Sequence, residues 1–586
     1  MNDKFYTNER NIQIVIYLLK AYGIRKIIAS PGTTNMTFVG SVQQDPYFEV
    51  YSAVDERSAA YIACGMAAES GEPVVLSCTG ATASRNYYPG LTEAFYRKLP
   101  LIAITSTQDP ARVGQLAEQV VDRSQCAKDL VVCSEHIQYI EAFSDEWNVT
   151  LKVNRALHAL RKHGGGPIHF NLETRYSINF SVKQLPPARM IEYVGAYDDM
   201  PTIPEGRIAV FIGSHRPMSK ELTKAIDRFC EAVGGVVFCS HVSNYKGEYA
   251  VDNTLVAAQD AYRSSLFTAD LLIFIGEVTG GDSQIEQLHS PTQWRVSEDG
   301  EVRDLKHHLM AVFEMPEQHF FDYYASHAGN ERSSDNEWLN ALRKEDEQVR
   351  ANIPDVPFSN IWIAQQTLHR LPEGCALHLG ILNTLRSWNF FHAPACVAIF
   401  SNTGGFGIDG IVSALIGASL ASPQRLCFGV VGDLAFFYDL NCLGNRHVGA
   451  NLRLLLINNG RGMEFRNPYH PCYQFGENAD AYMAAARHNG YMSPQLIMHF
   501  AQDLGYEYLS ASGKEEYLAA LERFVTPELT ERPMLFEVFT RTEDEQTALS
   551  AYHHLARNMK GNPQLRSALK NHLSPKLIEW LKQHIK

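Results

Sequence analysis

The most informative stretch of the chain is residues 425–465, RLCFGVVGDLAFFYDLNCLGNRHVGANLRLLLINNGRGMEF. The apolar run 426–431 predicts a buried strand that ends at a Gly-Asp turn, and the leucine-rich segment 452–457 predicts a second buried strand. In a strand-helix-strand unit with a right-handed crossover, the carboxyl ends of the two strands lie side by side at one edge of the sheet. Asp433 and Asn459 are therefore expected to come together, although they are far apart in the chain.

These two residues have the chemistry of a metal site. Carboxylate and amide oxygens are hard ligands that suit Mg²⁺, Ca²⁺ or Mn²⁺. The helix that should begin after Gly432 and carry Asp439 offers backbone N–H groups to a phosphate at its start. The stretch therefore predicts a seat for a diphosphate and a divalent metal. The alternative interpretation is an ordinary strand-turn-helix in which Asp433 caps the helix.

The same stretch resembles the GDG…NN signature of thiamine-diphosphate (ThDP) enzymes, with Leu434 as the third residue of the first triplet. This resemblance implies ThDP as cofactor and Mg²⁺ (or Ca²⁺ or Mn²⁺) as metal. It assigns the metal to Asp433, Asn459 and the backbone carbonyl of Arg461. The cofactor contacts that it implies here are Gly432, Asp433, Leu434, Asn459 and Met463.

Length and composition restrict the class of protein. The 586 residues exceed what one hydrophobic core usually supports, so several domains of about 150 to 200 residues are expected. A net charge of −13 argues against binding to nucleic acid or to anionic membranes. The 11 cysteines include no C-x-x-C motif, which indicates reduced thiols. No signal peptide and no long apolar run are visible, so a soluble, cytoplasmic protein is expected.

The first part of the chain alternates short apolar strands with helical patterns. Residues 26–29, 74–78 and 101–105 are predicted strands, each followed by turn residues. This alternation is typical of an open parallel sheet, in which ligands bind beyond the carboxyl ends of the strands. The turns after these strands are therefore where functional residues should be sought.

We expect an α/β protein with three doubly wound parallel-sheet domains. A Pro-rich segment at 185–204 and a charged segment at 333–358 are predicted linkers. In the terms of the ThDP family, the expected parts are an aminopyrimidine-binding (PYR) domain at 1–185, a central domain at 205–335, a diphosphate-binding (PP) domain at 358–545, and a basic helical tail at 546–586.

One carboxylate in the first domain has a distinctive setting. Glu56 lies in the sequence DERSAA, residues 55–60, at the start of an alanine-rich helix. The ordinary interpretation of such a residue is a surface carboxylate that is stabilised by its place at the N-terminus of a helix. ThDP enzymes, however, carry a single Glu in the setting D-E-R-x-A-A, and the resemblance implies that Glu56 is the catalytic proton-transfer group.

Residues 78–106, CTGATASRNYYPGLTEAFYRKLPLIAITS, extend the resemblance to SEPHCHC synthases, the carboligases of menaquinone synthesis, and to acetolactate synthases. It implies that Thr79 lies against the aminopyrimidine ring of the cofactor. In acetolactate synthases an active-site Gln follows a Gly at the spacing of Gly114 and Gln119, so the resemblance implies that role for Gln119; a solvated loop residue is the alternative.

A glycine-rich segment in the third domain allows two interpretations. Gly405, Gly407 and Gly410 fit the G-x-G-x-x-G pattern of a dinucleotide site, so an NAD-binding oxidoreductase is a rival hypothesis. The surrounding SNTGGFGIDG, residues 401–410, is instead similar to a SEPHCHC synthase segment. In that interpretation Gly407 contacts the cofactor and Ile408 wedges between its two rings.

Several substrate-binding positions of SEPHCHC synthases differ in this chain. Thr34 and Thr403 stand where arginines are expected, and Gly281-Asp282 stands where a Lys-Arg pair is expected. Arg386 is retained, which implies a catalytic or substrate-binding role for it. Since arginine is the natural partner of substrate carboxylates, we expect an acceptor that is less anionic than isochorismate, such as a sugar or a small aldehyde.

The resemblance implies ThDP- and Mg²⁺-dependent decarboxylation of a 2-oxo acid, followed by carboligation of the resulting enamine to a second carbonyl or another acceptor. A simple decarboxylase, an acetolactate-synthase-like enzyme and a non-catalytic ThDP-binding subunit remain alternatives. No FAD is expected. The expected partners are a 2-oxo acid donor, a small-molecule acceptor and further copies of the chain in a dimer or tetramer; neither nucleic acid nor membrane is expected.

Overall fold

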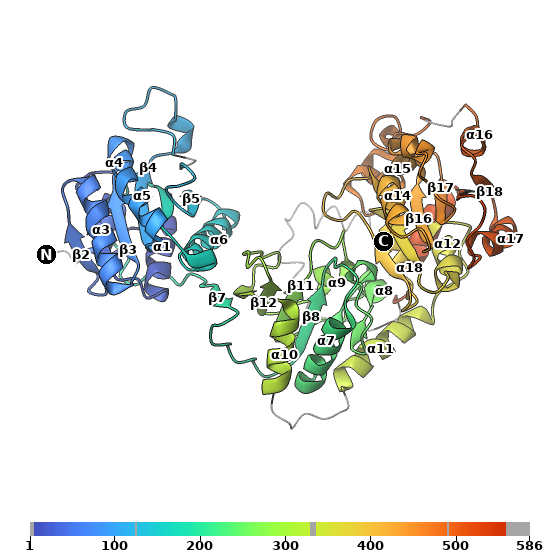
Figure 1. Cartoon of the computed structure of the whole chain (residues 1–586), viewed down its shortest axis with the longest axis horizontal. Coiled ribbons are helices and arrows are strands. Elements are labelled where there is room, and N and C mark those ends of the chain that lie inside the picture. The colour runs from blue at the N-terminus through green and yellow to red at the C-terminus, as the bar shows by residue number, and fades with distance from the viewer. Residues whose placement is uncertain (1–4, 124–125, 329–335, 489–491, 558, 560–586) are drawn as a thin grey trace. The chain divides into compact units, whose positions relative to one another are not determined.

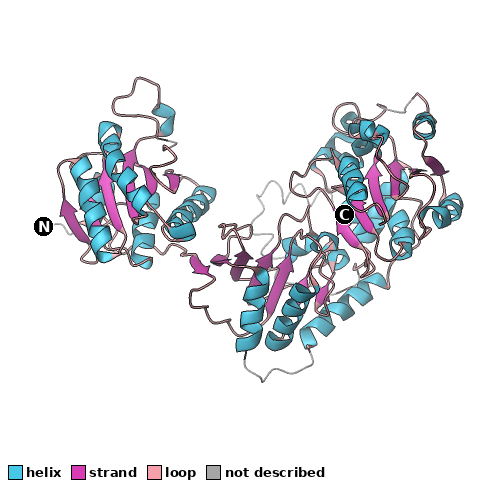
Figure 2. Ribbon diagram, in the orientation of Figure 1, coloured by secondary structure: helices cyan, strands magenta, loops and turns pink. Residues whose placement is uncertain are grey.

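Parallel β-sheets with flanking helices form the architecture of the protein (Figures 1 and 2). The computed structural model describes residues 5–123, 126–328, 336–488, 492–557 and 559. The chain divides into two compact units, of which the first comprises 1–200 with 297–315 and the second 201–296 with 316–586. The predicted α/β class with three doubly wound parallel-sheet domains is confirmed.

The first sheet has the strand order β2-β1-β3-β4-β6-β5, with all neighbours parallel. Its strands are β1 Lys26–Ala29, β2 Glu49–Ser52, β3 Val74–Cys78, β4 Leu101–Thr107, β5 Cys133–Ile137 and β6 Ile168–Glu173. The helices around it are α1 Arg10–Ala21, α2 Met36–Val42, α3 Glu56–Ser70, α4 Ala81–Asn86, α5 Tyr88–Arg97 and α6 Phe143–Ala159.

The second sheet contains the parallel order β10-β9-β8-β11-β12 in the second unit. The strands are β8 Ile208–Ile212, β9 Val236–Phe238, β10 Ala250–Val251, β11 Leu271–Ile275 and β12 Thr292–Ser297. In the first unit, β7 Glu192–Gly195 pairs in parallel with β13 Leu309–Glu314. The helices of this part of the chain are α7 Lys220–Val233, α8 Thr254–Ala257, α9 Ser283–Gln287, α10 Glu317–His327 and α11 Glu337–Arg350.

Helix α11 corrects the expectation that residues 333–358 form a linker. Most of its residues are charged or polar, but Trp338, Leu342 and Val349 are spaced so that they share one face of a helix. All three are buried in the core that also contains the second and third sheets' apolar residues. The scattered apolar residues of this segment are thus the buried face of an amphipathic helix.

The third sheet has the order β15-β14-β16-β17-β19-β18 and is also parallel throughout. Its strands are β14 Ala376–Leu379, β15 Ala398–Phe400, β16 Cys427–Gly432, β17 Leu452–Asn458, β18 Glu507–Ala511 and β19 Met534–Phe539. Its helices are α12 Asn360–Thr367, α13 Asn383–Trp388, α14 Ile411–Ala421, α15 Asp433–Tyr438, α16 Leu496–Asp503, α17 Lys514–Phe524 and α18 Thr542–His553.

The first and third sheets share one topology. When the strands are numbered within each domain, both sheets have the order 2-1-3-4-6-5. No obvious sequence repeat predicts this shared order. In the third sheet the central strand β17 is apolar from Leu454 to Ile457, and Leu452, Leu454, Leu455 and Leu456 are at most 1% exposed. Helices cover both faces of a parallel sheet, so its inner strands must be apolar on both sides.

Two parts of the chain complete the description. The basic tail predicted at 546–586 lies largely outside the described residues, apart from the end of α18 and a few residues after it. Among the described helices, none combines the length and the apolar character needed to cross a bilayer.

The crossing of α3 and α5 gives a stability test. A Cβ at Gly90 on α5 would lie 2.4 Å from the Cβ of Ala60 and 3.0 Å from its backbone carbonyl carbon, whereas a Cβ at Gly65 on α3 would meet nothing within 4 Å. We expect Gly90→Ala to destabilise the protein by about 1 to 3 kcal/mol because the helices must separate. Gly65→Ala is the matched control and should be neutral or stabilising by up to about 1 kcal/mol. Denaturant unfolding of both variants measures the difference; equal midpoints would contradict this view of the crossing.

Candidate active site

Asp433 is the first residue of α15 and directly follows β16. It is 6% exposed, and its Oδ1 accepts the backbone N–H of Leu434 at 2.9 Å. Burial raises the pKa of Asp433 to about 7, while the backbone N–H groups of Leu434, Gly460 and Arg461 partly oppose the rise. Because Gly460 and Arg461 belong to the turn after β17, the carboxylate lies against the turn that contains Asn459.

The turn after β17 is held by Asn458. Its Nδ2 donates to Glu537 Oε1 at 2.7 Å, and its Oδ1 accepts the N–H of Gly460 at 3.3 Å. The neighbouring Asn459 has a buried Oδ1 with no hydrogen-bond partner in the described chain. A buried acceptor without a partner costs free energy, and such atoms in native proteins commonly mark a ligand site.

A divalent metal fits this pair of oxygen donors. Within the described ranges, no group of three or more His, Cys, Asp and Glu side chains could hold a metal. A metal at this edge would be held by the carboxylate of Asp433 together with the amide oxygen of Asn459 and backbone carbonyls. Such an all-oxygen set suits Mg²⁺ or Ca²⁺ better than a softer metal.

The loops after β16 and β17 also pack on each other. A Cβ at Gly462 would lie 3.2 Å from Cδ2 of Leu434, and Met463, 9% exposed, starts the short 3₁₀ helix Met463–Arg466. Gly432 caps α15 in an extended conformation. Helix α15 is shorter than expected because Asp439 ends it: this carboxylate accepts the N–H and the Oγ–H of Ser413, both at 2.6 Å.

The glycine-rich segment 401–410 connects β15 to α14, as the sequence predicts. Gly407 and Ile408 are half-buried, and Ile408 packs against the apolar core. The segment follows β15, which is the edge strand of the sheet, whereas the strand order reverses between β14 and β16. Dinucleotides bind at the point of reversal, so this placement argues against an NAD-binding fingerprint.

In the first unit, Glu56 is the first residue of α3 and is half-buried. The helix is capped by Asp55, whose Oδ1 accepts the N–H of Ser58 at 2.7 Å. Glu56 Oε2 accepts a hydrogen bond from Asn86 Nδ2 at 3.3 Å. Because a neighbour performs the capping, the carboxylate of Glu56 is not needed for that purpose.

Thr79 lies at the reversal point of the first sheet, between β1 and β3. A Cβ at Gly32, in the turn after β1, would lie 1.7 Å from Cγ2 of Thr79, so only glycine permits this approach. In the same turns, Gly80 N donates to Thr34 Oγ1 at 3.2 Å. Thr79 thus stands where a parallel sheet of this topology receives its ligand.

Two other predicted residues have contrasting surroundings. Gln119 is exposed in the loop after β4, with a φ of 60°, in the left-handed region. Arg386, on α13, donates from Nη1 to Glu464 Oε1 at 2.5 Å. Apart from Gln119, the structure places the predicted residues near the carboxyl edges of two sheets, one in each unit, and each unit is described by itself.

Two functional candidates have no recognisable sequence signal. Arg123 is 5% exposed and donates to Asn171 Oδ1 and to the carbonyl of Ser106, both at 3.0 Å. Burial lowers the pKa of its guanidinium. A Cβ at Gly80 would lie 2.8 Å from Arg123 Nη1, so this arginine supports the turn after Thr79. The second candidate is Glu464, the partner of Arg386.

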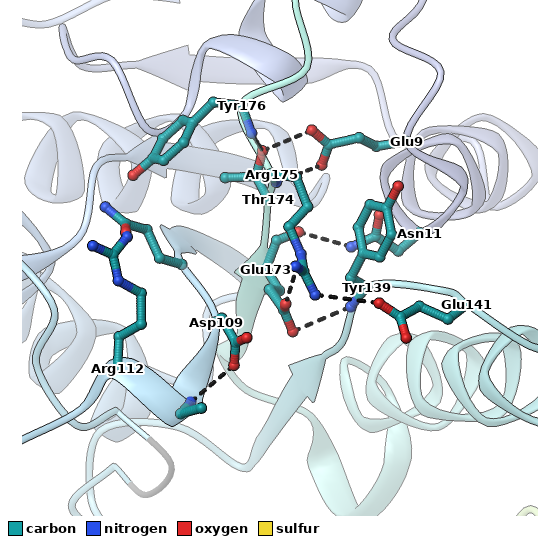
Figure 3. Close-up of polar contacts among 12 residues, drawn as sticks. Glu9, Asn11, Asp109, Arg112, Tyr139, Glu141, Glu173, Thr174, Arg175 and Tyr176 are labelled. Atoms are coloured by element: carbon teal, nitrogen blue, oxygen red, sulfur yellow. Dashed lines mark hydrogen bonds and ion pairs between the residues drawn. The ribbon is translucent and has the colours of Figure 1, made fainter. Parts of the chain in front are cut away.

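Other carboxylates at the edge of the first sheet are structural (Figure 3). Glu9 is 1% exposed and accepts hydrogen bonds from Thr174 Oγ1 at 3.1 Å and from the N–H of Arg175 at 3.2 Å. The side chain of Arg175 lies between Glu173 and Glu141, at 3.6 and 3.5 Å. These acids fix the loop after β6.

Comparison with known proteins gives the class of this chain. Residues 11–126 match the family model described as thiamine pyrophosphate enzyme, N-terminal TPP binding domain. The 2-succinyl-5-enolpyruvyl-6-hydroxy-3-cyclohexene-1-carboxylate synthases of Phocaeicola vulgatus and Bacteroides thetaiotaomicron are each 31% identical to the chain, over 94% of it and 99% of the relative. That of Porphyromonas gingivalis is 26% identical, over 94% of the chain and 98% of the relative.

The fold and the matched domain define a thiamine-diphosphate enzyme. Within this class, the chain belongs to the same family as these relatives, whose long name is abbreviated to SEPHCHC synthase. This membership decides against the NAD-binding oxidoreductase and favours an active enzyme over a non-catalytic subunit.

The aspartates at the two ends of α15, Asp433 and Asp439, allow ligand binding and folding to be tested separately. We expect Asp433→Asn to abolish the rise in melting temperature that ThDP with Mg²⁺ gives the parent protein, because a ligand that binds only the folded state stabilises it. Without ligand this variant should be at least as stable as the parent, since a desolvated carboxylate is removed.

Asp439→Asn is the matched control for this measurement. It weakens two short hydrogen bonds to Ser413 and should cost about 1 to 3 kcal/mol of unfolding free energy while the response to ligand persists. Thermal unfolding with and without ThDP and Mg²⁺ gives both quantities. A full ligand response in Asp433→Asn would contradict the assigned seat.

Proposed function

We propose that this enzyme uses ThDP and Mg²⁺ to decarboxylate a 2-oxo acid and then joins the remaining acyl unit to an acceptor that is less anionic than isochorismate. The observation that carries the proposal is the approach of the buried Asp433 carboxylate to the turn of Asn459, whose amide oxygen has no partner. A simple decarboxylase is the second candidate.

In this proposal the third sheet holds the charged end of the cofactor. Asp433, Asn459 and the carbonyl of Arg461 would coordinate the metal, and Gly432, Leu434 and Met463 would line the diphosphate. When bound, ThDP supplies a nucleophilic carbon that adds to the 2-oxo group and allows CO₂ to leave. The chain's part is to hold the diphosphate, exclude water and place the substrate.

The ring end of the cofactor would be served by other residues. Glu56 would hold a proton at N1′ of the aminopyrimidine, which is general acid-base work for a carboxyl group. Thr79 would lie against that ring, Ile408 would separate the two rings with Gly407 beside it, and Gln119 would face the substrate. Arg123 would act as a positioning residue, since it supports the turn that carries Thr79.

The proposed acceptor follows from the charges at the substrate positions. Thr34 stands in place of an arginine, is 7% exposed, and its hydroxyl already accepts the N–H of Gly80. Thr403, at a second such position, is 5% exposed. A polyanionic acceptor would lose several charge-assisted hydrogen bonds here, each worth about 1.5 to 3 kcal/mol. A sugar or a small aldehyde carries no carboxylate and does not need these charge-assisted hydrogen bonds.

A homo-oligomer, with a dimer as its smallest form, is part of the proposal. In the single chain, Tyr61 and Ile62 on α3 are each 48% exposed, and Tyr96 on α5 is 69% exposed. Adjacent helices with exposed large apolar side chains favour contact with another protein surface. The active site would then combine Glu56 of one chain with Asp433 of another.

Substitution of Glu56 tests the catalytic role. We expect Glu56→Gln to bind ThDP but to release CO₂ about 10²- to 10⁴-fold more slowly, because general acid-base transfer is lost. Glu69→Gln, on an exposed turn of the same helix, is the control and should match the parent. The measurement is CO₂ release with mass-spectrometric product detection across a panel of 2-oxo acids and acceptors. Full activity of Glu56→Gln with a true substrate would rule out the assignment.

Mixing two inactive variants tests whether the site is shared. If Glu56 and Asp433 of different chains form one site, exchange between Glu56→Gln and Asp433→Asn chains should restore activity. Half of the dimers would then be mixed, each with one of two sites intact, which gives about a quarter of the parent activity in a symmetric dimer. Analytical ultracentrifugation establishes the assembly, and no recovery after proven exchange would place both residues in one chain.

A further inference from the structure

The ion pair between Arg386 and Glu464 joins segments on either side of β16, the strand that leads to Asp433. Arg386 lies on α13, which follows β14, and Glu464 lies in the 3₁₀ helix after β17. Strands β14 and β17 are the two neighbours of β16, at whose end Asp433 begins α15. The distance between Arg386 Nη1 and Glu464 Oε1 is 2.5 Å. This pair is thus built into the same edge of the third sheet as the proposed metal seat.

The carboxylate of this pair is only partly satisfied. The side chain of Glu464 is 12% exposed, and its Oε2 is buried without a hydrogen-bond partner in the described chain. An exposed ion pair contributes little to stability, and a buried one must overcome the cost of desolvation. A carboxylate with one unpartnered buried oxygen is therefore a poor stabilising element, which favours a functional reason for its presence.

The arginine is confined on its other side. Gly281 has a φ of +92°, and a Cβ at this position would lie 3.2 Å from both Nε and Nη2 of Arg386. The backbone of the Gly280-Gly281 turn therefore comes close to the guanidinium. The fork that could receive a substrate carboxylate is held between this turn and the chain's own Glu464.

We propose that Glu464 determines donor specificity: it occupies Arg386 with an internal carboxylate and so selects 2-oxo acids that carry no second carboxylate. The inference rests on the proposed function. Glu464 directly follows Met463, a proposed cofactor contact, so the pair lies beside the place where the donor must bind. A second carboxylate on the donor would meet the negative charge of Glu464 and find Arg386 already paired. An uncharged donor end meets neither obstacle.

The test compares two donors that differ at this end. Glu464→Gln preserves the size of the side chain and a hydrogen bond to Arg386 but removes the charge. Glu477→Gln is the matched control, because Glu477 is exposed in the same loop region. For each protein with ThDP and Mg²⁺, kcat/KM for CO₂ release is measured with pyruvate and with 2-oxoglutarate.

The parent enzyme should prefer pyruvate. Glu464→Gln should shift the ratio of the two kcat/KM values toward 2-oxoglutarate by roughly 10- to 100-fold, the worth of one charge-assisted hydrogen bond. Glu477→Gln should leave the ratio unchanged. Adding Arg386→Gln to Glu464→Gln should remove the gain, because the arginine would be the group that Glu464 masks. An unchanged ratio in Glu464→Gln, or a parent preference for 2-oxoglutarate, would overturn the inference.

A binding measurement separates this inference from the proposed function. Glutarate is an inert dicarboxylate and can be titrated into each protein with ThDP and Mg²⁺ while the melting temperature is followed. Glutarate should stabilise Glu464→Gln and not the parent or Glu477→Gln. If no 2-oxo acid is decarboxylated by the parent, the proposed function fails, but the glutarate result still decides the role of Glu464. Equal responses of all three proteins would overturn it.

Discussion

The pairing of β16 with β17 is the constraint on which the site depends. Gly432 stands opposite Ile457 in this parallel pair, so the next residues of both strands leave the sheet at the same edge. A shift of one residue would turn every side chain to the opposite face and separate Asp433 from the turn of Asn459. The side chains of both strands are buried on one face or the other, including that of Arg453, whose guanidinium donates to the backbone carbonyls of Phe524 and Glu528, and this burial fixes the register. The raised pKa of Asp433 is thus a consequence of core packing.

One topology serves two different electrostatic purposes. The first and third sheets share the same strand order, and each has a buried charged residue close to the point where that order reverses. In the first sheet it is the cation Arg123, whose pKa burial lowers; in the third it is the anion Asp433, whose pKa burial raises. Opposite charges on equivalent scaffolds suit the two ends of a cofactor that has a polar ring at one end and a metal-bound diphosphate at the other.

Local patterns predict some features of this protein and leave others open. Strands β1 and β3 are predicted at their observed bounds, because a short apolar run between turn residues is typical of a buried strand. Helix α11 is missed because its apolar residues are sparse among charges. The G-x-G-x-x-G pattern is ambiguous in sequence, since only the strand order reveals that it follows an edge strand. The pairing of Arg386 with Glu464 joins α13 to the 3₁₀ helix after β17, two segments that lie far apart in the chain, and no local pattern encodes it.

Buried polar atoms without hydrogen bonds gather at the carboxyl edge of the third sheet. Among the described residues of the loops after β15 and β17, Ser401 Oγ, Asn459 Oδ1, Arg461 Nε and Glu464 Oε2 are such atoms. Each such atom destabilises the ligand-free fold, since its desolvation is not offset by a partner. The extended apolar core beneath these loops supplies the stability that makes this arrangement tolerable. A fold with this distribution gains most from a ligand that brings both a cation and hydrogen-bonding groups to one edge, which is what a metal-bound diphosphate offers.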